Sequence, residues 1–361
     1  MKAYPGGRTT ISTLLAVSTT LAVMLAGGGG PSAHASASLP AKATLVYFIF
    51  TGFTYPYFAP MAQGVTAAAK QYPNLNIKTI SASNSASTEI TDINEAIASG
   101  AKGIILNPVQ ESVTRAAQQA MSKGIPVITI DRDVANVSAR LAFIGDKDVV
   151  LGQIQTQYGL KYLASHHVRK PWHVVILQGT LGASTAIDRL NGALQVLKPY
   201  TRNGSVKIVF NQSANFMTSV AQSMISELLA KTRNIQLIVC GNDAMALGAI
   251  RALKDHGLTP GKSVFVVGAD AQPESMRAIK DGTQLDTVTH SPYLEAVWAV
   301  EAMSNYLQSK IKPPADKFPQ GNVIIPMTLV TRANVGRIAA WGTPSTIPPL
   351  PYGHAKPLVV H

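Results

Sequence analysis

From Thr44 onward, short apolar runs alternate with longer segments in which apolar residues recur every three or four positions. The runs have the length of strands and the longer segments have the period of helices, so the pattern predicts repeated β–α units. The predicted strands are 44–50, 75–80, 102–106, 126–130, 173–177, 206–210, 236–239, 264–267 and 285–289. The predicted helices are 57–71, 87–98, 112–123, 149–165, 184–197, 218–231, 243–256, 273–280 and 292–309. Ser87 and Asp243 are expected to cap two of these helices.

The β–α units fall into two similar sets, each of roughly 110–140 residues, the size of an ordinary domain. This organisation predicts an α/β fold with two doubly wound parallel-sheet lobes. Residues 143–148 are interpreted as a short crossing between them. The proline-rich segment 336–361 is interpreted as an extended arm rather than a third domain.

Residues 1–37 have the pattern of a signal peptide for export. Lys2 and Arg8 precede an apolar stretch, and glycines and a proline then lead to a site of small residues. We expect cleavage after Ala35 or Ala37 and a periplasmic location. The mature chain then has a single cysteine, Cys240, within an apolar run, so it cannot form an internal disulfide.

The chain is basic, with 31 lysine and arginine residues against 19 acidic ones and a net charge of +12. These basic residues are scattered singly, without the basic runs or aromatic-interleaved patches of nucleic-acid-binding proteins. The charge therefore bears on solubility, and no nucleic-acid partner is expected.

Polar residues follow several of the predicted strands directly. The strand 126–130 ends in Asp131, Arg132 and Asp133. Ligands of open α/β sheets bind beyond the carboxyl ends of the strands, and Asp accepts hydrogen bonds where Arg donates them. Such a pair suits a small polyhydroxylated ligand, although it could also simply cap a loop. The other candidates that follow strands are Tyr55, Tyr57, Phe58, Asn242, Asp243, Asp270 and His290.

Four segments carry a resemblance to a known family. They are Tyr55–Phe58, Val127–Arg132, Gly241–Gly248 and Val266–Asp270. In order and spacing they resemble the periplasmic sugar-binding proteins of the ribose-binding type, across residues 43 to about 335.

The resemblance implies a type I periplasmic binding protein, with two lobes joined by a three-segment hinge. Its crossings would lie near 145–148, 289–292 and 319–323. The first lobe would comprise 42–146 and 291–320, and the second 147–290 and 321–335. A monosaccharide or sugar alcohol would bind between the lobes and pass to the permease of an ABC transporter and its ATPase. The resemblance also implies a monomer without catalytic residues, cofactor or metal.

Carried over residue by residue, the resemblance places two aromatics of the first lobe, Tyr57 and Phe58, against the sugar ring. Asp131 and Arg132 would bind its hydroxyls. Phe216, Asn242 and Asp270 would contact it from the second lobe.

Three positions depart from the ribose-binding pattern. Tyr55 stands where those proteins have Asn, His290 where they have Gln, and Ile187 where they have Arg. Arg189 lies two residues farther on, about 200° around the helix, and is not expected to replace that Arg. The ligand could therefore be a deoxy sugar, a different pentose or hexose, or a polyol.

Three other functions are compatible with parts of the sequence. A carbohydrate-active enzyme is the first, since Asp131 and His290 could act as acid and base. The sequence lacks a complete nucleophile-elbow or P-loop motif, and its eight histidines have no metal-type spacing. Regulators of the lac-repressor type share the fold, but they begin with a DNA-binding head where this chain has an export signal. A binding protein for sensing, through a chemoreceptor or for a quorum signal such as autoinducer-2, remains open.

Overall fold

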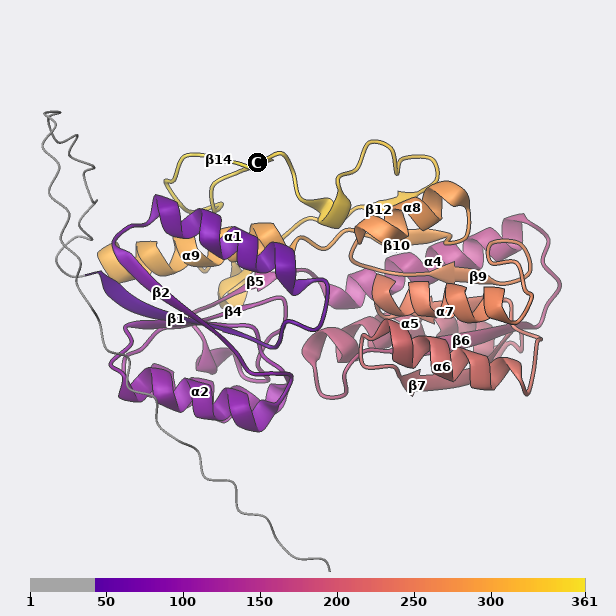
Figure 1. Ribbon diagram of the computed structural model, residues 1–361, viewed down its shortest axis with the longest axis horizontal. Coiled ribbons are helices and arrows are strands. Elements are labelled where there is room, and N and C mark those ends of the chain that lie inside the picture. The colour runs from indigo at the N-terminus through magenta and orange to yellow at the C-terminus, as the bar shows by residue number, and fades with distance from the viewer. Residues whose placement is uncertain (1–42, 361) are drawn as a thin grey trace, which may run out of the picture. The chain divides into compact units, whose positions relative to one another are not determined.

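Two six-stranded sheets organise the protein in the computed structural model, which describes residues 43–360 (Figure 1). The first sheet has the order β11-β5-β4-β3-β1-β2, and all its strands are parallel. Its strands are β1 (Thr44–Phe50), β2 (Leu75–Ser81), β3 (Gly103–Leu106), β4 (Val127–Ile130), β5 (Ala142–Gly145) and β11 (Asn322–Ile324). The signal peptide predicted for 1–37 lies outside the described residues.

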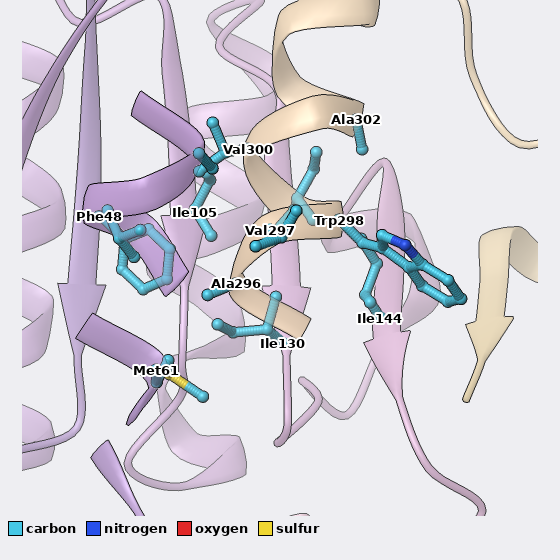
Figure 2. Close-up of a cluster of buried hydrophobic side chains, with 14 of the residues drawn as sticks. Phe48, Met61, Ile105, Ile130, Ile144, Ala296, Val297, Trp298, Val300 and Ala302 are labelled. Atoms are coloured by element: carbon cyan, nitrogen blue, oxygen red, sulfur yellow. The ribbon is translucent and has the colours of Figure 1, made fainter. Parts of the chain in front are cut away.

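Helices cover both faces of this sheet, which explains why its inner strands are apolar without alternation. On one face lie α1 (Phe58–Gln71) and α9 (Pro292–Ser309), and on the other α2 (Ala86–Ala98) and α3 (Thr114–Ser122). In β4, Ile128 and Ile130 point into the first layer and Val127 into the second. Figure 2 shows α9 inserting Val297, Trp298 and Val300 among side chains of the sheet.

The second sheet has the order β12-β10-β9-β8-β6-β7 and is parallel except for β12, which runs antiparallel to β10. Its strands are β6 (Trp172–Gln178), β7 (Val206–Ser213), β8 (Leu237–Cys240), β9 (Phe265–Val267), β10 (Asp286–Val288) and β12 (Leu329–Thr331). The helices around it are α4 (Asp148–Ser165), α5 (Ser184–Arg202), α6 (Thr218–Leu229), α7 (Asp243–Asp255) and α8 (Pro273–Asp281). Each sheet with its helices is called a lobe below. The α/β class with two doubly wound lobes is confirmed.

From β1 to β12 the chain passes between the lobes three times: after β5, after β10, and after β11. The third crossing was predicted at 319–323, and this is wrong. Residues 322–324 form β11, which extends the first sheet by pairing with β5, and Val323 is buried in the first lobe. The crossing therefore lies between Ile324 and Leu329, so the predicted boundary at 320/321 divides the lobes too early.

Two predicted helix caps are also wrong. The side chain that caps α2 is that of Ser85, which accepts from the Thr88 amide, rather than that of Ser87. At α7 the cap is Asn242, whose Oδ1 accepts from the Met245 amide at 3.0 Å. The carboxylate of Asp243 instead accepts hydrogen bonds from the side chains of Gln284 and Thr287.

Segment 336–360 is extended with little regular structure, as the prolines predicted. It contains a 3₁₀ turn (η4, Ala340–Gly342) and a two-stranded hairpin of β13 (Thr346–Ile347) and β14 (Leu358–Val359). Among the helices of residues 43–360, none combines the length and apolarity that a bilayer crossing requires.

Candidate ligand-binding site

A small cavity lies where the carboxyl ends of the two sheets meet. It is lined from the first lobe by Tyr55, Tyr57, Phe58, Asp131 and Arg132, from the second by Thr185, Arg189, Phe216, Asn242 and Asp270, and from the crossing after β10 by His290. Its free space of about 30 Å³ holds a water molecule or two. A sugar can therefore enter only if the lobes move apart.

The lobes contact each other directly beside this cavity, so the structure represents a closed arrangement. The Glu111 amide donates to the Gly182 carbonyl oxygen at 2.9 Å, and the Asp133 amide donates to Ser184 Oγ at 2.8 Å. In each case the donor belongs to the first lobe and the acceptor to the second.

The Asp131–Arg132 pair follows β4, as its sequence position predicted. Asp131 has a left-handed backbone with φ of 58°, and its Oδ2 accepts from Asn107 Nδ2 at 2.8 Å. Arg132 Nε lies 3.7 Å from the same carboxylate oxygen. The Arg132 guanidinium also lies over the ring of Phe216 in the other lobe, at 5.5 Å from its centroid. Among the described residues Arg132 Nε has no hydrogen-bond partner, so a donor buried beside the cavity is unused.

An aromatic wall forms the first-lobe side of the cavity, at the start of α1. Phe58 meets both Tyr55 and Tyr57 edge to face, at centroid distances of 5.8 and 5.7 Å. The Tyr57 hydroxyl donates to Glu295 Oε2 at 2.9 Å. Burial and the nearby Glu295 raise the pKa of Tyr57, which keeps this phenol a donor. With Phe216 opposite, the cavity has aromatic faces on both sides, an arrangement that suits the C–H surface of a sugar ring.

Arg189 organises the second-lobe side. Its guanidinium donates to Asp148 Oδ1 at 2.6 Å, to the Gly241 carbonyl oxygen at 2.8 Å and to Asp270 Oδ1 at 2.9 Å. The side chain of Asp270 is thereby held in place at the cavity wall. A fully buried Arg with this many partners positions its neighbours.

His290 joins the two lobes through hydrogen bonds. Arg189 Nη2 lies 2.7 Å from its Nδ1, and a guanidinium can only donate, so in the neutral imidazole Nδ1 accepts this bond and the ring proton is on Nε2. Nε2 donates to Glu295 Oε1 at 2.9 Å. Burial raises the pKa of Glu295 to about 7, against the opposing effect of His290. Burial lowers the pKa of His290, but the nearby Asp146 and Glu295 outweigh it and raise that pKa.

Asp131, His290 and Glu295 each offer a ligand-type atom, and these atoms lie within 4.8 Å of one another. A cation here would compete with the guanidinium of Arg189 and with the hydrogen bond from Nε2 to Glu295. The arrangement is that of a hydrogen-bonded network.

The cavity brings together nine of the ten residues proposed from the sequence. Ile187 is the exception, since its partly exposed side chain does not line the cavity. Arg189, which was not expected to replace the family's Arg, does line the cavity. On α5, Thr185 and Arg189 are one turn apart and share the face that points to the cavity. Ile187, midway between them in sequence, lies about 200° around the helix from either residue and so faces away. This four-residue spacing was the signal available in the sequence. Glu295 and Asn107, which form hydrogen bonds with Tyr57 and Asp131 respectively, carried no such signal.

Residues 46–311 match the family model described as periplasmic binding protein domain. The ribose import binding protein of Salmonella typhimurium is 29% identical over 281 residues, which cover 77% of this chain and 90% of that protein. The galactofuranose-binding protein of Escherichia coli is 28% identical and covers 66% of this chain and 75% of its own length.

Solved structures agree with these relatives. The myo-inositol binding protein of Caulobacter, bound to myo-inositol, superposes with a TM-score of 0.75 at 25% identity, over 84% of this chain and 98% of its own. The arabinose-binding component from Shewanella sp. ANA-3, bound to L-arabinofuranose, gives 0.71 at 28% identity, over 81% and 93%. The chain therefore belongs to the periplasmic binding protein family and is of the ribose-binding type.

Proposed function

We propose that this protein is the exported binding component of an ABC importer and that it carries a monosaccharide or sugar alcohol between its lobes. The observation that carries the proposal is the pairing of polar groups across the cavity. Asp131 and Arg132 come from the first lobe and Asn242 and Asp270 from the second, with aromatic rings on both sides. A ligand with hydroxyl groups around an apolar ring can satisfy all of them at once.

The mechanism follows from the closed arrangement. In an open state the ligand meets the groups of one lobe only, whereas closure adds the hydrogen bonds of the other lobe. The ligand therefore shifts the equilibrium towards the closed state by the free energy of those added bonds. The closed, liganded protein would then dock on the permease. The names of the relatives support this reading, because they describe import and binding proteins for ribose, galactofuranose and myo-inositol.

Catalysis is the weaker alternative. The relatives named above are binding proteins. His290, which would be needed as a base, has both ring nitrogens engaged by Arg189 and Glu295 and does not offer a free lone pair to the cavity. A sensing role uses the same binding site, and a permease and ATPase encoded beside this protein would favour import over sensing.

The test is a thermal-shift screen of the chain without residues 1–37 against D-ribose, L-arabinose, D-galactose, myo-inositol, xylitol and deoxy sugars. A ligand present at about 100 times its Kd stabilises the native state by about 2.7 kcal/mol, a clear rise in Tm. One strong hit is expected. A folded protein whose Tm moves with none of these compounds contradicts sugar binding, and autoinducer-2 is then the next compound to test.

A further inference from the structure

The C-terminal segment 336–360 contacts both lobes. At its start, Ile338 packs together with the preceding Val335 against Met276 and Ile279 of α8 in the second lobe. Beyond η4, Ile347 and Leu350 are buried in the core of the first lobe. Figure 1 shows this segment in yellow, passing from β12 and α8 to the helices α1 and α9.

Specific hydrogen bonds hold its far end on α9. Trp298 Nε1 donates to the Pro348 carbonyl oxygen at 2.9 Å. The carboxylate of Glu301 accepts from the backbone amides of Leu350 at 2.9 Å and Ala355 at 3.3 Å. The segment is therefore anchored in the first lobe and could not simply swing away with the second.

Between these anchors the segment crosses the hinge at η4. Gly342 lies so close to the crossing after β10 that a Cβ there would be 2.6 Å from Cβ of Thr289. The hydroxyls of Thr343 and Ser291 are 3.2 Å apart. The segment thus runs beside one of the three crossings, the one after β10, and forms a fourth connection between the lobes.

Trp341 contacts both lobes at this point. Its backbone amide donates to the Ala271 carbonyl oxygen at 2.6 Å, directly after Asp270 of the second lobe. Its indole meets the ring of Tyr57 edge to face at 5.8 Å, on the aromatic wall of the first lobe. It holds a left-handed backbone with φ of 58°, which a non-glycine residue adopts only when its surroundings compensate the cost.

We propose that segment 336–360 is a fourth hinge element that favours the closed arrangement, and that Trp341 is the residue through which it positions Tyr57. Separating the lobes moves Tyr57 and Ala271 apart, so Trp341 must release one of its two contacts. The closed state therefore keeps an interaction that the open state loses, even without ligand. This inference rests on the proposed function insofar as closure serves ligand binding.

The test uses the ligand-free protein, so that it does not depend on which sugar binds. Hydrogen–deuterium exchange is followed at the amides of Glu111 and Asp133, whose hydrogen bonds join the lobes. In Trp341→Ala both amides should exchange about tenfold faster, because aromatic contacts are worth up to about a factor of ten in an equilibrium. Amides inside the sheets, such as those of Ile128 and Ile238, should keep their wild-type rates.

Three further variants make the result specific. Trp341→Phe keeps an aromatic ring against Tyr57 and should restore most of the protection. Gly342→Ala should act in the same direction as Trp341→Ala, because the added Cβ pushes η4 away from Thr289. Lys356→Ala, at an exposed position of the same segment, should change nothing.

Unchanged exchange at Glu111 and Asp133 in both Trp341→Ala and Gly342→Ala would overturn the inference. Equal acceleration at Ile128 and Ile238 would also overturn it, since it would mean that the segment only stabilises the fold. Failure of the sugar screen would leave this result untouched, so the two proposals fail independently.

Discussion

Asp131→Asn is the most informative single change to the proposed site. Asparagine tolerates the left-handed backbone at this position better than most non-glycine residues, and its oxygen can still accept from Asn107. The change therefore removes the negative charge with little disturbance of shape. It also replaces one acceptor at the cavity with an amide donor.

The magnitude follows from the contacts. At the 3.7 Å that separates Asp131 Oδ2 from Arg132 Nε, two unit charges interact by about 4 kcal/mol at an effective dielectric of about 20, before any desolvation is subtracted. Hydrogen bonds to charged groups contribute about 1.5–3 kcal/mol net. We expect the loss of affinity to lie in that range, which is about 10- to 150-fold in Kd.

Asp133→Asn is the matched control in the same loop. Asp133 forms two hydrogen bonds of 2.7 Å with Arg140 and accepts a third from Thr129, and it does not line the cavity. Asp133→Asn should lower Tm and leave Kd nearly unchanged. Asp131→Asn should raise Kd and leave Tm nearly unchanged. Titration calorimetry with the hit of the sugar screen, together with thermal unfolding, measures both. A Kd for Asp131→Asn within twofold of wild type, or an equal loss in Asp133→Asn, would refute the site assignment.

Two predictions concern stability. Burial raises the pKa of Glu89 to about 8 although its Oε2 accepts from the Val109 amide, so the folded state holds a proton that the unfolded chain releases near pH 4.5. The contribution of this protonated carboxyl to the free energy of unfolding is complete below about pH 4.5 and is lost as the pH rises through 8. Glu89→Gln should therefore flatten the fall in stability with pH, measured by chemical denaturation over a pH series. An unchanged slope would mean that Glu89 is ionised in the native state. Gly152→Ala should lower Tm by many degrees, because its Cβ would overlap the carbonyl oxygen of Arg189 where α4 crosses α5, while Gly336→Ala has open space and should be neutral. Similar Tm values for both glycine variants would contradict this close packing.

Much of the site could be located from the sequence because strand ends are local features. The apolar runs before Asp131 and before Asn242 each indicate a buried parallel strand. The carboxyl ends of the parallel strands in one sheet lie at the same edge. The resemblance then supplied the partners in the other lobe. The wrong face of one helix, α5, was assigned to the cavity. The family's Arg position is occupied by Ile187, which faces away, whereas Thr185 and Arg189 face the cavity.

The sequence by itself determined the class of fold, the division into two lobes and most of the residues at the cavity, because hydrophobic periodicity is a property of neighbouring residues. Only the tertiary structure decided contacts between residues far apart in the chain. The pairing of β11 with β5 moved the third crossing, since a three-residue strand carries too little pattern to assign. The network of Arg189, His290 and Glu295 depends on three elements meeting at one point. The proline-rich sequence of the C-terminal segment likewise does not predict its path across the hinge. The apolar surfaces that hold the segment form only when both lobes are folded.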